Sequence, residues 1–301
     1  MGTTNDVIVV PASISNPNSF KKRNRKKRAA KATTPDRNMS EFIIDGYIED
    51  FHNDHLKKNR FKQAINGIVV EIGRYSVTYD NFVNSFKAHG DVTCDTMSVY
   101  AQIYNDEASH DALSKPFLKK FTFAPAISEM LMKDPSEFDK KFVILEFNWI
   151  MNYLGFDLSS MDILHFPSVW STNWVLIAVN PLYETINFFD ATSLTSAEDQ
   201  QILMNNLAIN LNTFCKELKI FAKDIGSFKK PKSPSYTADT QLNDDGICIM
   251  LYAENWTGKF MKNFTKEIIP EYWKMKGYDM FYYIQNKVAV QHFKKRKKRK
   301  F

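Results

Sequence analysis

Three polar residues stand at the ends of apolar segments, where buried structure meets solvent. Asn173 precedes the run WVLIAV, Asp190 follows INFF, and Asp245 with Gly246 precedes ICIML. An asparagine amide does not titrate near neutral pH, and a carboxylate is a poor nucleophile toward an amide bond. By residue type alone, these positions therefore supply neither a base that titrates near neutral pH nor a strong nucleophile.

The cysteines and histidines do not suggest a metal or cofactor site. Cys94, Cys215 and Cys248 are odd in number, far apart and without a CxxC pair, which excludes a disulfide framework or cysteine zinc site and favours a reducing compartment. His52 and His55 have i, i+3 spacing, which is more typical of a solvated helix face than of a zinc site. No phosphate-binding glycine loop is present. We expect no metal and no cofactor.

The elements that must position these residues follow one another closely. Segments 161–166, 174–179 and 185–189 have the pattern of strands, and the middle one is apolar throughout, so we expect it to be central and covered on both faces. A helix is predicted before them, opening at Asp134-Pro135 and ending near Gly155.

Two further helices complete this region. Thr195 and Glu198 form a capping-box pattern for a helix that runs to about Leu218, and 247–256 forms a short apolar helix. Strands followed by helices indicate a mixed α+β domain.

The chain before residue 135 has a looser pattern. Short strands are predicted at 68–72 and 75–78, and helices at 41–57, 79–86 and 96–104. The predicted division is a disordered basic tail at 1–40, a helical and mixed accessory region at 41–135, the α+β domain at 136–290 and a basic tail at 291–301.

Charge is concentrated in two short blocks. Lys21–Lys31 holds eight Lys/Arg and Lys294–Lys300 seven, so the net charge of +6 leaves 6 − 15 = −9 for the rest. Such blocks are typical of nuclear import signals bound by importins and of non-specific nucleic-acid binding. We see no signal peptide and no apolar stretch long enough for a membrane span. The expected location is the nucleus, otherwise the cytoplasm.

Two sequence blocks carry a family resemblance. The first is Asn173-Trp174-Val-Leu-Ile-Ala-Val-Asn180 followed by Ile186-Asn-Phe-Phe-Asp190-Ala-Thr-Ser193. It resembles the H-W-x-L strand, hairpin and D-S strand end of the SUMO/sentrin-specific (ubiquitin-like-protein) cysteine proteases. The second, Gln241-Leu-Asn-Asp244-Asp245-Gly246 and the apolar helix after it, resembles that family's Q-x-N-x-x-D-C-G block. Each block alone fits any buried strand or turn, but their order and spacing together favour this family.

The second block points to one branch of the family. Its helix runs on to Glu254-Asn-Trp256-Thr-Gly258, which resembles the E-x-W-x-G ending of plant, transposon-associated members. The resemblance implies a papain-like or adenain-like cysteine peptidase fold, with a central mixed β-sheet flanked by helices, over 136–290. It also implies a groove for a SUMO or ubiquitin-like modifier, with Trp174 in the wall of the channel for the modifier's tail.

Position by position, the resemblance predicts a degenerate site. Asp190 matches the triad aspartate, whereas Asn173 stands at the histidine position and Asp245 at the cysteine position. Gln241 matches the oxyanion glutamine but lies two residues too close to Asp245, and a gapless alignment places Asp239 there. Loss of nucleophile and base together removes the mechanism; comparable losses in serine proteases cost on the order of 10⁶ in turnover.

Purely structural roles would explain the residues at the cysteine and histidine positions. Asp245 is suited to be the N-cap of the helix that follows. Asn173 would be a solvated polar group at a strand start or a hydrogen-bond partner of Asp190. Cys248 and His165 are the nearest thiol and imidazole in sequence, and we expect a buried helical cysteine and a core or edge histidine.

Three functions remain open at this point. The first is a pseudoprotease that binds a SUMO-like or ubiquitin-like modifier without cutting it. The second is an active deSUMOylating cysteine peptidase that uses Cys248 or another residue. The third is a nuclear, transposon-derived protein in which Lys21–Lys31 and Lys294–Lys300 bind nucleic acid and the folded domain is a relic.

Overall fold

The computed structural model describes residues 67–87, 90–111, 118–154, 157–221, 223–232, 244–262, 264 and 267–288. Contacts divide the chain into Met1–Phe42 and Ile43–Phe301, and all described residues belong to the second unit. The predicted helix at 41–57, the two histidines at its end and both basic blocks lie outside the described residues.

A four-stranded mixed sheet organises the described chain. Its strand order is β3 (Lys120–Thr122), β4 (Ile163–Trp170), β5 (Asn173–Asn180), β6 (Thr185–Asp190). The β3–β4 pair is parallel, whereas the β4–β5 and β5–β6 pairs are antiparallel. All eight residues of β5 are buried, which confirms the predicted covered central strand and the α+β class.

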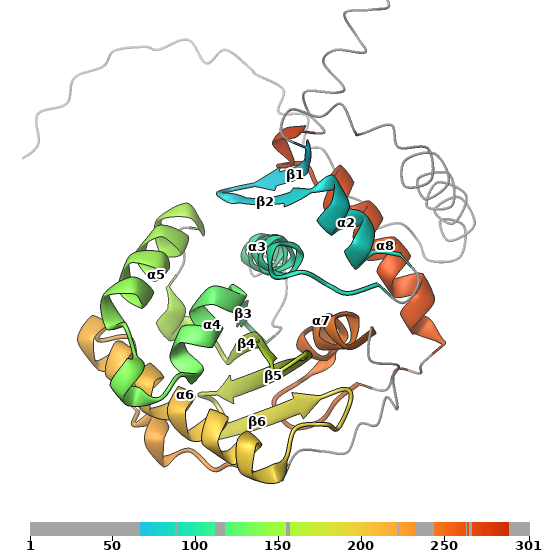
Figure 1. Cartoon of the computed structure of the whole chain (residues 1–301). Coiled ribbons are helices and arrows are strands. Elements are labelled where there is room, and N and C mark those ends of the chain that lie inside the picture. Colours follow the sequence, from blue (N-terminus) through green and yellow to red (C-terminus); the bar gives the residue numbers. More distant parts are fainter. Residues whose placement is uncertain are drawn as a thin grey trace, which may run out of the picture. The chain divides into compact units, whose positions relative to one another are not determined.

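Side chains of β5 alternate between two hydrophobic clusters, one on each face of the sheet. Trp174, Leu176 and Ala178 belong to the first cluster. Figure 1 shows the helices of this cluster around α7 and the hairpin β1–β2. Its elements are β1 (Ile68–Ile72), β2 (Tyr75–Thr78), α2 (Tyr79–Ser85), α3 (Cys94–Asp111), α7 (Asp245–Asn255) and α8 (Ile268–Tyr282).

The second cluster covers the opposite face of the sheet. Val175, Ile177 and Val179 of β5 point into it. Its helices are α4 (Pro125–Met132), α5 (Lys140–Leu154) and α6 (Ala197–Leu218), which lie together in Figure 1. The short 3-10 turns are η3 (Pro135–Glu137), η4 (Leu158–Ser160) and η5 (Ile225–Ser227). No helix in this described part of the chain is both long and apolar enough to cross a bilayer.

Two predicted helix starts are wrong by a few residues. Asp134 caps the turn η3 through the Ser136 N–H, at 2.9 Å, and α5 begins only at Lys140. Phe138 is extended, which interrupts the helical run, and Asp139 caps α5 through the Phe142 N–H at 3.0 Å. A second aspartate closer to the helix therefore supplies the cap.

The α6 helix begins one residue later than the predicted capping box. Ser196 is the N-cap, and its Oγ accepts a hydrogen bond from the Asp199 N–H at 3.0 Å. Thr195 donates its N–H to Asp190 Oδ2 at 2.8 Å instead. The loop around Asp190 thus sets the register in which α6 starts.

Three elements were not predicted: β3, α4 and α8. Because β3 has three residues, its pattern is too short for a period-2 signal. It pairs with β4, so the sheet takes strands from both sides of residue 135. The division of the chain at that residue stays a prediction.

Asn286 fastens the last described segment to the first strand. This side chain is completely buried, and its Oδ1 accepts the Glu71 N–H at 3.1 Å. Its Nδ2 donates to the carbonyls of Phe281, at 2.7 Å, and Val69, at 3.4 Å. Lys287 adds an ion pair with Glu71 at 2.7 Å. The two ends of the described chain are therefore joined by side-chain bonds.

Candidate functional site

The first turn of α7 meets the start of β5 through one carboxylate. Asp245 is 3% exposed, and its Oδ2 accepts the main-chain N–H of Trp174 at 2.6 Å. Its Oδ1 accepts the Gly246 N–H at 2.7 Å. Asp244, rather than Asp245, occupies the N-cap position and makes no side-chain cap bond. Asp245 is therefore the first helical residue and bonds α7 to the strand.

The surroundings of Asp245 disfavour its negative charge. Burial raises the pKa of Asp245 to about 6, because the carboxylate loses its hydration. The two N–H bonds from Trp174 and Gly246 oppose this rise, whereas the charges of Asp91 and Asp190 add to it. The site is thus an acidic one in which the central carboxylate is partly neutralised by protons at mildly acidic pH.

Asp190 is held by the loop that follows its own strand. Its Oδ1 accepts the N–H and hydroxyl of Thr192, at 2.8 and 2.7 Å, and the N–H of Ser193 at 3.1 Å. Its Oδ2 accepts the Thr195 N–H. Burial raises the pKa of Asp190, but these hydrogen bonds outweigh it and hold the pKa below its usual value. Asp190 is therefore an ionised residue with a structural role in its loop.

Asn173 is buried at the first position of β5. It is 6% exposed, so the solvated alternative is wrong, and it lies opposite Trp170 across the β4–β5 hairpin. Its Oδ1 is 3.5 Å from the Thr172 hydroxyl. The hydrogen bonds that Asp190 accepts from described residues come from its own loop. Asn173 therefore does not bond to Asp190 as a histidine oriented by this aspartate would.

Trp174 lies beneath the start of α7. Its side chain is buried, and its Nε1 donates to the Val92 carbonyl at 2.8 Å. A Cβ on Gly246 would lie 2.6 Å from Val92 Cβ and 3.0 Å from Trp174 Cδ1. Only glycine allows this approach of α7 to Trp174 and Val92. The channel-wall role of Trp174 stays a prediction.

The remaining predicted residues are not brought into this site. Gln241 lies outside the described residues. Cys248 is fully buried in the first cluster, inside α7, as predicted. His165 is fully buried on β4, with its Nδ1 3.3 Å from Thr122 Oγ1, and burial keeps its pKa well below the usual value. Neither the thiol nor the imidazole is placed to react with a substrate.

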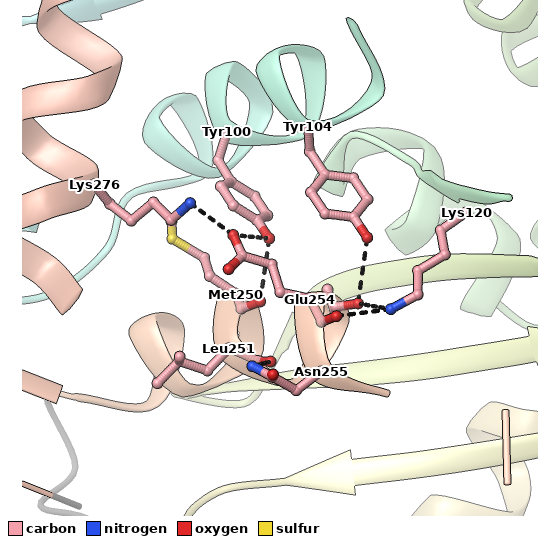
Figure 2. Close-up of polar contacts among 9 residues, drawn as sticks. Tyr100, Tyr104, Lys120, Met250, Leu251, Glu254, Asn255 and Lys276 are labelled. Carbon is pink, nitrogen blue, oxygen red and sulfur yellow. Dashed lines mark hydrogen bonds and ion pairs between the residues drawn. The ribbon is translucent and has the colours of Figure 1, made fainter. Parts of the chain in front are cut away.

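The carboxyl end of α7 is built quite differently, as Figure 2 shows. The Lys120 ammonium group donates to the carbonyls of Glu254, at 2.8 Å, and Ala253, at 3.1 Å. The Glu254 carboxylate pairs with Lys276 at 2.8 Å and lies 3.4 Å from the Tyr100 hydroxyl. Burial lowers the pKa of Lys120 to about 8. Side chains from β3, α3 and α8 thus converge on the end of this helix.

The three residues of the E-x-W-x-G resemblance have structural roles. Glu254 belongs to the network just described, and Trp256 donates its Nε1 proton to Asn180 Oδ1 at 3.3 Å. Gly258 has a φ of +88°, and a Cβ there would lie 2.9 Å from the Tyr183 ring. The three matching residues therefore help to hold the end of α7 in place and have no catalytic role in the structure.

Asp91 and Lys120 were not anticipated from the sequence. Asp91 precedes α3 as an exposed residue of an irregular segment, and Lys120 begins a strand too short to be detected. Their relation to α7 depends on contacts across more than a hundred residues, for which a single sequence holds no signal. No group of three or more potential metal ligands occurs among the residues that the structure describes.

Comparison with known proteins identifies the fold. No family model and no curated protein sequence matches the chain. Among solved structures, the C-terminal Ulp1 protease domain in complex with Smt3, the yeast ortholog of SUMO, superposes with a TM-score of 0.53 and 12% identity, over 76% of this chain and 93% of that one.

Two related structures give the same result. Ulp1 with its catalytic cysteine oxidised to a sulfenic acid gives a TM-score of 0.54 at 12% identity, over 78% of this chain and 94% of that one. The Ulp1-like SUMO protease catalytic domain of Chaetomium thermophilum gives 0.50 at 12%, over 79% and 87%. The chain therefore has the fold of the Ulp1 SUMO protease catalytic domain, which confirms the predicted fold class.

Proposed function

We propose that this protein is a pseudoprotease of the ubiquitin-like protease type, of the plant, transposon-associated branch, that binds a SUMO-like or ubiquitin-like modifier without cutting it. The fold is that of a SUMO protease domain, and one protein with this fold was solved in complex with Smt3. The Glu254, Trp256 and Gly258 match supports the branch. Nothing in this function requires turnover.

One observation supports the proposal that the protein has no peptidase activity. At the helix start where the resemblance requires a thiolate, the carboxylate of Asp245 is bonded to two main-chain N–H groups. Hydrolysis needs a nucleophile that is free to attack a carbonyl and a base that can move its proton. Asp245 is committed to the fold, and Asn173 carries no titratable proton.

The alternative of an active peptidase is poorly supported. Cys248 is the cysteine closest to Asp245 in sequence, but it faces the core within α7. Cys94 is an exposed residue, but partial burial of its thiol, together with the charges of Glu129 and Asp95, raises the thiol pKa and disfavours a thiolate. A thiol-reactive modifier probe should therefore leave the chain unlabelled.

Two assays test the proposal together. The full chain is titrated with Smt3 and with ubiquitin by calorimetry, and it is incubated with a Smt3–peptide fusion to detect cleavage. We expect binding to at least one modifier and no product. Absence of binding to both modifiers overturns the proposal that the protein binds a modifier. Cleavage of the fusion refutes the proposed inactivity. If that cleavage survives a Cys248→Ser change, Cys248 is not the nucleophile.

As a separate part of the proposal, the basic blocks support a nuclear location and contacts to importins or to nucleic acid. Lys21–Lys31 and Lys294–Lys300 together carry fifteen Lys/Arg, whereas the remainder has a net charge of −9. Deleting both blocks should abolish nuclear accumulation and retention on DNA. If the acidic remainder alone still binds DNA, the blocks are not the cause, because it should repel phosphate.

A further inference from the structure

The outward face of α6 lacks the charges that a surface helix normally carries. The run Gln200–Cys215 contains no Asp, Glu, Lys, Arg or His. Ile202 and Ile209 are 45% and 49% exposed, and because they are seven residues apart they lie on the same side of the helix. Leu194, in the loop before the helix, is 62% exposed. The middle of this helix therefore presents large apolar side chains on an uncharged surface.

The polar side chains near these isoleucines are already bonded within the chain. Gln201 Nε2 donates to Asn205 Oδ1 at 3.0 Å, and Asn206 Nδ2 donates to the Met132 carbonyl at 3.2 Å. The Thr213 hydroxyl donates to a carbonyl of its own helix at 2.9 Å. A partner that covers this face removes water from groups that keep a hydrogen bond, which lowers the cost of desolvation.

Charges return only at the two ends of this face, and their signs are opposite. Glu198 lies in the first turn of α6 and Lys216 in the last, and both are exposed. They share the side of Ile202 and Ile209, since steps of four, seven and seven residues connect the four positions. Neither charge has an ion pair with a described residue. We call the face from Glu198 to Lys216 the α6 stripe.

This order of charges is complementary to itself when two copies run in opposite directions. A two-fold axis at the level of Leu207, midway between the charges, places Glu198 of each copy against Lys216 of the other. The isoleucines of both copies then meet in the middle. A parallel pair would bring like charges together at both ends, and an anionic lipid surface would be repelled by the acidic end.

We propose that the α6 stripe pairs antiparallel with the same stripe of a second copy, which makes the protein a two-fold symmetric dimer. The stripe is about 27 Å long and about 10 Å wide, which is well below the area per partner of a standard interface. The dimer is therefore weak, with a Kd on the order of 10–100 µM. Because α6 and α7 belong to different clusters, pairing uses the face of the sheet opposite to the candidate site and does not depend on the proposed function.

Sedimentation velocity of the full chain tests this association directly. The protein is measured from about 1 to 300 µM, a range that spans the expected Kd. A reductant keeps the exposed Cys94 from cross-linking two copies. We expect the sedimentation coefficient to rise with concentration toward that of a dimer. A monomer throughout the range, or association that continues beyond a dimer, overturns the inference.

A charge placed in the middle of the stripe should prevent pairing. Ile202→Asp and Ile209→Asp should each weaken the dimer at least tenfold, because the new carboxylate would be buried without a partner. The matched control is Leu145→Asp, at a 70% exposed position of α5, which should leave association unchanged. All three positions are exposed, so circular dichroism should show an intact fold. A dimer that survives both isoleucine changes, or that Leu145→Asp weakens equally, overturns the role of the stripe.

Reversal of the end charges tests the antiparallel order. Glu198→Lys brings two lysines together at each end and should weaken the dimer about three- to tenfold at low salt, since exposed charge pairs contribute modestly. Combining it with Lys216→Glu exchanges the two charges and should restore the original Kd. Failure of the double change to restore association would refute the antiparallel pairing.

Discussion

Each end of α7 has a charge that complements the helix dipole, buried in Asp245 and half-buried in Lys120, yet the surroundings of the two charges are opposite. At the amino end, Asp245 is negative and is opposed by Asp91 and Asp190. At the carboxyl end, Lys120 is positive, and although Lys262 lowers its pKa, the charge of Glu254 supports it. Burial shifts both groups toward their neutral forms.

The difference distinguishes an anchored helix end from the candidate functional site. The carboxyl end has side chains from three elements, with opposite charges paired at 2.8 Å in the Lys276–Glu254 contact (Figure 2). The amino end relies on main-chain N–H donors and leaves like charges together. No ion pair between described residues balances this charge, and like charges held together are costly to folding and more common at functional sites than in a structural network. Three changes probe this contrast, in order of decreasing effect.

Restoring the missing groups at the amino end should have the largest effect. The double change Asp245→Cys with Asn173→His should raise cleavage of a fluorogenic Smt3 substrate by at least about 10³-fold over the unchanged chain, because nucleophile and base act as a unit. Either change alone should give almost no product. Continued inactivity of a folded double variant that binds Smt3 would show that the register of the site differs from the resemblance.

Removing the charge at the amino end should change the pH dependence of stability. The folded pKa of Asp245, about 6, lies above its ordinary 3.8, so the folded state binds the proton more tightly. Its contribution is therefore favourable below about pH 4 and is lost as the pH rises to 6, by about 3 kcal/mol. Urea unfolding at several pH values should show this loss in the unchanged chain.

The same urea series on two variants isolates the group responsible. Asp245→Asn should lack this component of the fall in stability between about pH 4 and pH 7, whereas Glu137→Gln should retain it. An identical pH profile for Asp245→Asn and the unchanged chain would mean that Asp245 is ordinarily hydrated and that the two ends of α7 are alike in this respect.

Breaking the Glu254–Lys276 ion pair at the carboxyl end of α7 should destabilise the fold and should not create peptidase activity. Glu254→Gln leaves Lys276, whose side chain is 19% exposed, without its carboxylate and should lower the free energy of unfolding by about 2 kcal/mol. The matched change Glu217→Gln breaks the Lys140 pair, whose side chains are 40% and 49% exposed, and should cost less than about 0.5 kcal/mol. If both changes lowered the free energy of unfolding equally, the ion pair at the end of α7 would be no more important for stability than the exposed pair.

The sequence predicted the strands of the sheet better than the bounds of the helices that cover it. Strand β5 was recognisable because an unbroken apolar run of its length is typical of a covered central strand. The start of α6 was misplaced by one residue, since Thr195 and Ser196 are equally good caps in sequence and only the bond from Thr195 to Asp190 distinguishes them. Local patterns thus found the elements but not the contacts that set their ends.

The site was predictable in part for the same reason. Asn173, Asp190 and Asp245 were singled out through the family resemblance, and the structure places all three at the ends of the expected elements. The bond from Asp245 to Trp174 spans 71 positions of the sequence, and Asp91, which raises the pKa of Asp245, lies even further from it along the chain. Interactions of that range depend on the folded arrangement, which residue types alone do not specify.

The contacts of Asn286 have a practical consequence for engineering this protein. Since its amide bonds tie the segment after α8 to β1, the points where the described chain begins and ends lie beside each other. A short peptide joining Gly67 to Val288 should close the chain into a ring, and a new opening in an exposed turn such as Ser171-Thr172 would then give a permuted protein. Reporter groups attached at Gly67 and Val288 of a chain shortened to these residues would, by the same geometry, share a single edge of the fold.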